Sequence, residues 1–143
     1  MSESIYVQNL TKRFENVEAL NGISFSVQQG ELFGFLGPNG AGKTTALQCL
    51  VGLTRADEGV IDVLGSKSGP GWKRDLGYVG EQHPFYDRWS GAKNLSFLSH
   101  FFPGWRPDRA ERLAKRFDLE LGRQVRHLSR GDRVKLALVA ALA

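Results

Sequence analysis

The stretch that decides the fold is Gly37-Pro38-Asn39-Gly40-Ala41-Gly42-Lys43-Thr44, because it matches the G-x-x-x-x-G-K-[ST] pattern of phosphate-binding loops. Glycines let the backbone curl with its N–H groups turned inward, and no Cβ keeps an anion away. A helix opening at Thr44 adds the positive end of its dipole. The sequence therefore predicts a nucleotide site, with Lys43 on the β- and γ-phosphates, Thr44 as an oxygen ligand of Mg²⁺ and Thr45 on the α-phosphate.

The segments on either side of this loop fit the same interpretation. Leu32-Phe33-Gly34-Phe35-Leu36 is a continuous apolar run, typical of a parallel strand buried on both faces. Residues 44–53 predict a helix with Gly52 near its end. The alternative is a glycine-rich turn that binds nothing, and the presence of both flanking elements favours nucleotide binding.

Apolar patterning predicts the remaining elements. Alternation predicts strands at 4–9 and 23–28 with a turn and a short strand at 11–19 between them, and apolar runs predict strands at 59–64 and 76–80. Ser90 is the expected N-cap of a helix through His100, and Pro107 suits the first turn of the next helix. One stripe of that next helix is apolar: Ala110, Leu113, Ala114 and Phe117. Residues 134–143 are apolar nearly all round, which predicts a helix buried in a larger body.

Composition bounds the class of protein. The chain has 143 residues, 41% hydrophobic and 24% charged, as expected for one globular domain, which excludes wholesale disorder. No apolar run reaches the ~18 residues of a membrane span, and the first residues lack the pattern of a signal peptide. The single cysteine, Cys49, excludes a disulfide framework and a multi-cysteine zinc site. We therefore expect a reducing, cytosolic setting.

The positive charge is local. The net charge is +4, and residues 104–135 hold ten Lys/Arg against five Asp/Glu. This stretch predicts either solvated helices with basic outer faces or a patch for nucleic acid or anionic lipid. The interspersed carboxylates favour the solvated helices, and we expect no nucleic-acid partner. The three histidines, His83, His100 and His127, show no metal-ligand spacing.

Further motifs narrow the class of nucleotide protein. Leu128-Ser129-Arg130-Gly131-Asp132 resembles the LSGGQ signature of ATP-binding cassette (ABC) proteins, with Arg130 and Asp132 departing from it. GPNGAGKTT at 37–45 is similar to the cassette form of the phosphate loop, and Phe14 falls where cassettes carry an aromatic that stacks on adenine. Residues 76–81 lie where cassettes carry the Q-loop, and the segment from Phe85 onward resembles the helical subdomain of bacterial export-type cassettes.

This resemblance, which covers essentially the whole chain, implies an α/β fold. The expected fold is the N-terminal part of a P-loop NTPase of the ABC ATPase type. It has an antiparallel β subdomain and the partial RecA-like core sheet within 1–88, an α-helical subdomain at 89–127, and the signature with its helix at 128–143. The implied function is the ATP-binding subunit of a transporter, in which ATP-driven closure of two cassettes moves a membrane permease.

The resemblance also implies roles for single residues. Ser129 and Gly131 would face the γ-phosphate bound to a second cassette, in a head-to-tail dimer, so Ser129 acts in trans; the alternative is a simple serine N-cap. Glu81 replaces the usual glutamine of the Q-loop and would bind Mg²⁺ or orient water, unless Gln82 takes that role or Glu81 is a solvated loop carboxylate. The alternative for Phe14 is a core aromatic. We expect the Asp132 side chain to point away from a bound polyanion.

Partners and location follow from the same resemblance. Residues 89–127 would contact the permease, with 81–89 as the coupling segment, on the cytoplasmic face of the cell membrane. The alternatives are a cassette that remodels nucleic acid or ribosomes, and a nucleotide-binding module without turnover.

Cassettes continue into a Walker B strand that ends in Asp-Glu and supplies the base for the attacking water, whereas Val60-Ile61-Asp62 is followed by Val63. The chain thus resembles the N-terminal part of a cassette, and we expect it to hydrolyse ATP poorly or not at all.

Overall fold

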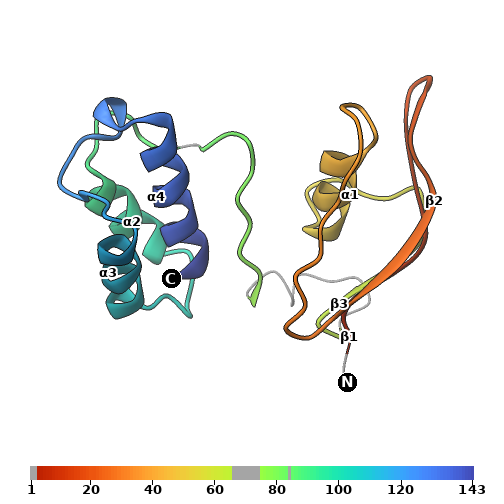
Figure 1. Ribbon diagram of the computed structural model, residues 1–143, viewed down its shortest axis with the longest axis horizontal. Helices are drawn as coiled ribbons and strands as arrows, with labels where there is room; N and C mark the ends of the chain where they lie inside the picture. The colour runs from red at the N-terminus through yellow and green to blue at the C-terminus, as the bar shows by residue number, and fades with distance from the viewer. Residues whose placement is uncertain (1–2, 66–74, 84) are drawn as a thin grey trace. The chain divides into compact units, whose positions relative to one another are not determined.

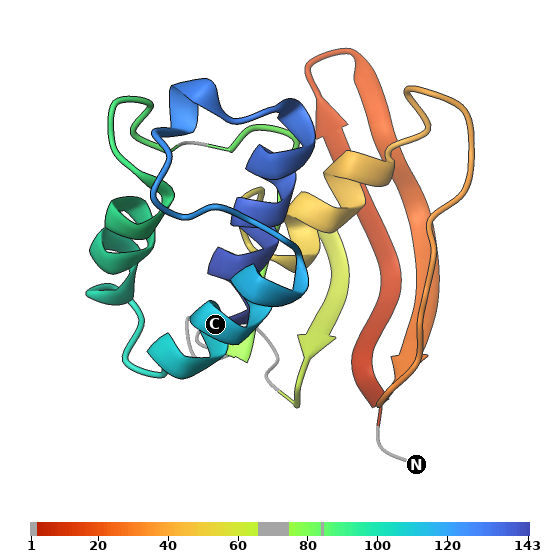
Figure 2. The same cartoon turned by 60° about the vertical axis from the view of Figure 1, so that its left-hand side comes forward.

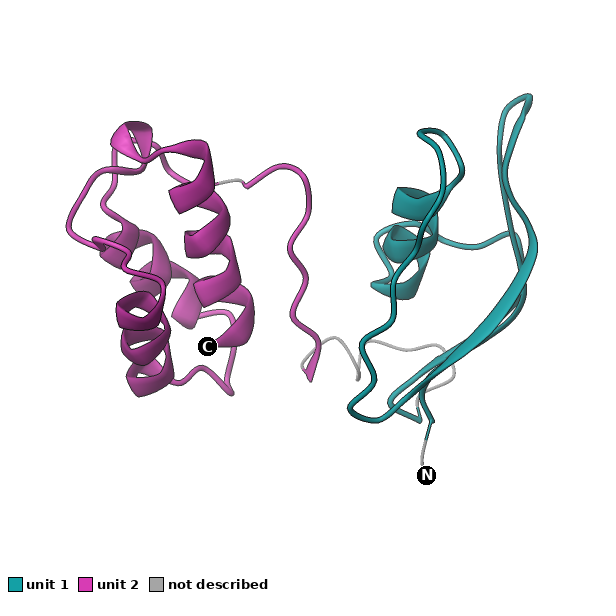
Figure 3. Cartoon of the chain, viewed as in Figure 1, with its two compact units in different colours: residues 1–73 teal, residues 74–143 magenta. Residues whose placement is uncertain are grey.

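The computed structural model describes residues 3–65, 75–83 and 85–143. Figures 1 and 2 show its elements from two sides, and Figure 3 shows that they divide into two compact units, residues 1–73 and 74–143. The first unit holds strands and one helix, and the second holds helices. Among the described helices, none combines the length and the apolar character needed to cross a membrane.

Unit 1 is built on a long β-hairpin. Strand β1 (Glu3–Phe14) pairs antiparallel with β2 (Val17–Gln28) on one side and with β3 (Glu58–Val63) on the other, in the order β2-β1-β3. Helix α1 (Lys43–Leu50) lies on one face of this sheet (Figure 2). The buried apolar side chains of the unit come from both layers: Val7, Leu10, Leu20, Val27, Ala46, Cys49, Leu50 and Val63. The predicted strands at 4–9, 23–28 and 59–64 and the predicted helix after the loop are thereby confirmed.

Gly59 explains how closely β3 approaches β1. Its φ is +101°, and a Cβ at this position would meet the carbonyl oxygens of Asn9 at 2.5 Å and Gln8 at 2.6 Å. The two strands therefore close together only because this residue has no side chain.

Unit 2 packs three α-helices around a core. These are α2 (Gly91–Ser99), α3 (Pro107–Arg116) and α4 (Arg130–Leu142), with the short 3-10 helix η2 (Val125–His127) before α4. The buried cluster draws on all of them: Leu95, Ala110, Ala114, Leu119, Val125, Leu128, Leu136 and Val139. Leu113 and Phe117 pack against this cluster, which confirms the predicted apolar stripe of α3.

Local signals place the starts of α2 and α3 as predicted. Ser90 is the N-cap of α2, and its hydroxyl accepts a hydrogen bond from the Lys93 N–H at 3.1 Å. Pro107 opens α3. Helix α4 begins at Arg130, four residues earlier than its apolar run, because Ser129 caps it there; Val134 and Leu142 are exposed, so this helix is not buried all round.

Three strand predictions are wrong. Residues 32–36 and 76–80 form no strand, and Leu32 and Leu36 are 99% and 96% exposed. A strand needs a backbone partner, and no described residue pairs with either segment, so the expected parallel core sheet is absent from the described part of the chain. Phe33 and Phe35 instead pack on Phe25 of β2, with ring centroids 5.2 and 5.1 Å apart. The third prediction, a turn with a short strand at 11–19, is replaced by a hairpin whose strands run to Phe14 and from Val17.

Candidate functional site

The glycine loop of unit 1 is seated on strand β2. Gly42 is the N-cap of α1, with φ at 80°, and a Cβ at this residue would collide with the carbonyl oxygen of Ala19 and lie 2.8 Å from Leu20 Cδ2. A glycine is required here both by the left-handed backbone and by this contact. The contact fixes the start of α1 against the hairpin.

The Lys43 ammonium lies inside the curl of the loop. Lys43 Nζ donates hydrogen bonds to the Gly37 carbonyl at 2.8 Å and the Pro38 carbonyl at 2.5 Å, and the Ala41 N–H donates to the same Pro38 carbonyl at 3.3 Å. No side-chain oxygen caps α1, since its N-cap is a glycine. The first-turn N–H groups and the ammonium thus offer positive charge in one place, which suits a polyphosphate.

Thr44 and Thr45 stand in the first turn of α1. Thr44 is exposed and Thr45 half-buried, and neither hydroxyl makes a hydrogen bond within the described chain. A free hydroxyl oxygen is a ligand that Mg²⁺ accepts, usually together with phosphate oxygens and water. Thr44 therefore fits the predicted metal ligand. Among the described residues, no three or more His, Cys, Asp or Glu side chains lie together as a metal site.

Phe14 lies at the end of β1 and is 45% exposed, so it is not the core aromatic that was its alternative. In the hairpin register, Phe14 pairs with Val17 and Lys12 pairs with Leu20. Because Gly42 contacts Ala19 and Leu20, the phosphate loop and the exposed ring lie at the same end of the hairpin. Lys12 Nζ lies over the ring, 5.1 Å from its centre.

Ser129 and Gly131 begin helix α4 in unit 2. The Ser129 hydroxyl accepts a hydrogen bond from the Asp132 N–H at 3.1 Å and donates one to the Asp132 carboxylate at 2.7 Å. The Asp132 carboxylate therefore closes on the serine, and it also accepts a hydrogen bond from Lys135 at 3.1 Å. That this side chain points away from a bound polyanion stays a prediction. The Ser129 hydroxyl and the Lys135 ammonium hold the pKa of Asp132 below its usual range.

Glu81 and Gln82 are exposed in the non-helical segment 76–83 of unit 2. The candidate residues are thus divided between the units: Phe14 and 37–45 belong to unit 1, and Glu81, Ser129 and Gly131 belong to unit 2.

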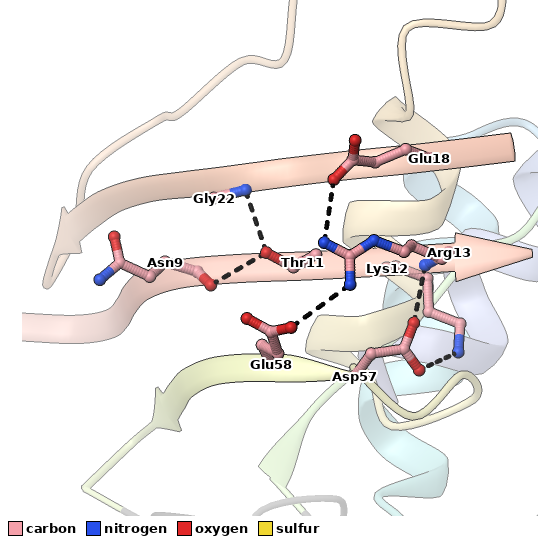
Figure 4. Close-up of polar contacts among 8 residues, drawn as sticks. All are labelled: Asn9, Thr11, Lys12, Arg13, Glu18, Gly22, Asp57 and Glu58. Atoms are coloured by element: carbon pink, nitrogen blue, oxygen red, sulfur yellow. Dashed lines mark hydrogen bonds and ion pairs between the residues drawn. The ribbon is translucent and has the colours of Figure 1, made fainter.

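Two polar groups escaped the sequence analysis. Asp57, just before β3, bonds to Lys12 and Arg13 of β1 (Figure 4). Asn94 of α2 is buried and makes three hydrogen bonds to the backbone of Tyr86 and Ser90. Asp57 is far from its partners in sequence, so no spacing pattern reveals its contacts. Asn94 could have been predicted, because an asparagine on the inner face of a predicted helix indicates a buried polar contact.

Half of the bases in the stretch 104–135 are paired with carboxylates. Five of its ten bases form ion pairs with carboxylates: Arg106 and Arg112 with Asp108, Arg123 with Glu120, Arg133 with Asp87, and Lys135 with Asp132. Paired surface charges suit solvated helices better than a phosphate-backbone footprint.

Comparison with known proteins decides the family. A family model described as "ABC transporter" matches residues 20–143. The chain belongs to the ABC transporter family. The predicted resemblance is thereby confirmed.

Individual cassettes agree with this assignment. The SkfA peptide export ATP-binding protein SkfE of Bacillus subtilis (strain 168) is 34% identical over 142 residues, 95% of this chain and 59% of that protein. The sulfate/thiosulfate import ATP-binding protein CysA of Nephroselmis olivacea is 35% identical over 147 residues, 98% of this chain and 43% of that protein. The chain therefore spans about half the length of these curated relatives.

A solved structure confirms the fold. The dimeric structure of a bacterial ABC transporter cassette matches with a TM-score of 0.84 at 24% identity, over 96% of this chain and 68% of that one. The chain therefore has the fold of the N-terminal part of a P-loop ABC ATPase, as predicted, with the parallel core sheet missing from its described residues.

Proposed function

We propose that this cassette binds Mg·ATP in unit 1. The observation that carries the proposal is the loop that curls round the Lys43 ammonium and rests on β2 beside the exposed Phe14 ring. The triphosphate would lie on residues 37–45 and the adenine on Phe14. Lys43 and the α1 N–H groups neutralise phosphate charge, and Thr44 supplies a ligand for Mg²⁺, which when bound would screen the β- and γ-phosphate oxygens.

Calorimetric titration of the chain with Mg·ATP tests this proposal. Hydrogen bonds to a charged group contribute strongly to binding, so we expect Lys43→Ala to weaken ATP binding about ten- to a hundredfold. Lys115→Ala, which removes an equal charge from α3, is the control and should leave the dissociation constant unchanged. The proposal would be contradicted if the unchanged chain gave no saturable heat. It would also be contradicted if the Lys43→Ala variant and the unchanged chain bound ATP equally well.

We further propose that the complete protein is the ATPase subunit of a transporter. Ser129 and Gly131 would face the γ-phosphate of ATP held by a second cassette, in a head-to-tail dimer, and the dimeric assembly of the related cassette supports this partner. Glu81 would act beside the triphosphate, on Mg²⁺ or on a water. Closure of the two cassettes on bound ATP would then drive transport, and hydrolysis by the complete protein would follow.

The helical part of unit 2 carries a surface suited to a membrane partner. Tyr86, Trp89, Phe97 and Phe101 form a chain of aromatic contacts with centroids 4.4 to 5.7 Å apart, and all but Trp89 are exposed. Asn94 ties the backbone of Tyr86 to α2, so the cluster is held in shape. An exposed aromatic patch of this kind marks an interaction surface. It supports a permease contact within 81–127, at the cytoplasmic face of the membrane.

Affinity capture with the full-length protein separates this function from its rival. A co-purifying permease subunit supports transport, and a ribosome or DNA supports a cassette that remodels nucleic acid. The ion-paired bases of 104–135 favour the first outcome. Relatives named for export and for import resemble the chain about equally, so export remains a prediction from the sequence of the helical subdomain.

A further inference from the structure

The Asp57 carboxylate makes contacts that hold the end of strand β1. Its Oδ1 accepts a hydrogen bond from Lys12 Nζ at 2.8 Å, and its Oδ2 accepts one from the Arg13 backbone N–H at 2.7 Å (Figure 4). Lys12 and Arg13 are the two residues that directly precede Phe14. One carboxylate therefore fixes a side chain and the main chain beside the exposed ring.

The side chain of Asp57 acts as an additional rung of the sheet. The pairing of β3 with β1 ends at Thr11 and Glu58, and the Asp57 N–H still donates to the Thr11 carbonyl at 3.0 Å. Beyond this point no backbone group of β3 pairs with β1. The next N–H of β1 on that side, that of Arg13, donates its hydrogen bond to the Asp57 carboxylate instead. Without it, the last residues of β1 would be held by β2 alone.

The same carboxylate positions a cation against the ring. The Lys12 side chain is only 14% exposed, whereas the Asp57 side chain is 38% exposed, so protein covers most of the lysine and the carboxylate remains in contact with water. The Lys12 ammonium lies 5.1 Å from the centre of the Phe14 ring. A cation over one face of an aromatic ring holds it in place and leaves the other face for a ligand.

The neighbouring Arg13 guanidinium makes a different set of contacts. It reaches Glu18 of β2 and Glu58 of β3 at 3.3 Å each, and its side chain is mostly exposed. These ion pairs bridge the strands but contact neither Lys12 nor the main chain of Arg13. Glu18 therefore offers a matched control for Asp57, with the same charge at the same end of the hairpin.

From this geometry we propose that Asp57 is a positioning residue for the base of the nucleotide: it fixes the backbone before Phe14 and holds Lys12 against one ring face, so that adenine stacks on the other. The inference rests on the proposed binding of ATP at Phe14 and residues 37–45. It predicts that Asp57 contributes to recognition of the base and not of the triphosphate.

Calorimetric titrations with Mg·ATP and with magnesium tripolyphosphate separate these contributions. Stacking of a base on an aromatic side chain accounts for about five- to a hundredfold in affinity, so we expect Asp57→Ala to weaken ATP binding by a part of this, about three- to tenfold. Its affinity for tripolyphosphate should not change. Glu18→Ala should change neither affinity. In a Phe14→Ala background, Asp57→Ala should have no further effect on ATP binding, because the ring that it positions is gone.

Each other outcome overturns a defined part of the proposal. Equal losses of ATP and tripolyphosphate affinity would show that Asp57 has only a structural role, and unchanged ATP affinity would show that it has none at this site. No binding of either ligand by the unchanged chain would refute the nucleotide site itself, and with it the inference. If Asp57→Ala does not fold, Asp57→Asn keeps an acceptor for the Arg13 N–H and loses the charge that holds Lys12, and the same comparison of ligands applies.

Discussion

The hydroxyl of Ser129 makes two hydrogen bonds to one residue, Asp132. It accepts one from the Asp132 N–H and donates one to the Asp132 carboxylate. A carboxylate in the first turn of a helix also offsets the positive end of the helix dipole, the same charge that would attract a phosphate. In the proposed dimer, a γ-phosphate would thus compete with Asp132 for this serine. The replacement of the signature glutamine by aspartate therefore has a direct structural consequence.

We expect Ser129→Ala to raise the pKa of Asp132 towards its ordinary value of 3.8, because the serine hydroxyl is the main group that lowers it. A carboxyl group whose pKa is lowered in the folded chain stabilises the fold above pH 3.8, and this contribution is lost as the pH falls through the folded-state pKa. The ¹³C shift of the Asp132 carboxyl carbon, followed against pH, measures the change. Ser99→Ala, which removes a hydroxyl bonded elsewhere, is the control. An unchanged pKa in the Ser129→Ala variant would contradict this account.

Among the elements, those with local signals were predictable from sequence. Ser90, Pro107 and Ser129 mark the starts of helices because their effect acts within one turn. Helix α1 has no side-chain cap, and the phosphate-loop motif located it. The segment at 32–36 was not predictable, because the hydrogen bonds of a strand lie with a partner and not in its own apolar composition. The sequence likewise located the phosphate loop but not Asp57, whose partners are distant along the chain.

Two glycines of the loop allow the cost of backbone strain to be measured apart from the cost of a steric clash. Gly40 and Gly42 have nearly equal φ angles, 84° and 80°, but a Cβ at Gly40 meets nothing within 4 Å and one at Gly42 meets β2. We expect Gly40→Ala to lower the free energy of unfolding by about 1–2 kcal/mol, the cost of a left-handed residue with a side chain. Gly42→Ala should cost about 1–3 kcal/mol more, because the added methyl group displaces Ala19 or Leu20. Urea unfolding measures both, and equal losses would mean that the loop is not seated on the hairpin.

At the scale of the whole molecule, the groups that bind the phosphates differ from the group that activates the attacking water. The loop offers an ammonium, backbone N–H groups and the Thr44 hydroxyl, and these act by position and charge. Activation of water in this reaction needs a carboxylate base next to the γ-phosphate. The sequence predicts that this chain has only the first set of groups, since its 143 residues contain the loop but no apolar run that ends in Asp-Glu.

The 143-residue chain should therefore bind ATP without turning it over. Phosphate release from saturating Mg·ATP should stay at the background rate of the Lys43→Ala variant, while calorimetry shows tighter binding of ATP by the unchanged chain than by this variant. Glu81 is the one expected carboxylate of the site within these residues. Because we expect no turnover, Glu81→Gln should leave phosphate release at the same background rate. Steady phosphate release that disappears in Lys43→Ala would contradict the prediction, and its loss in Glu81→Gln as well would identify Glu81 as the group that activates water.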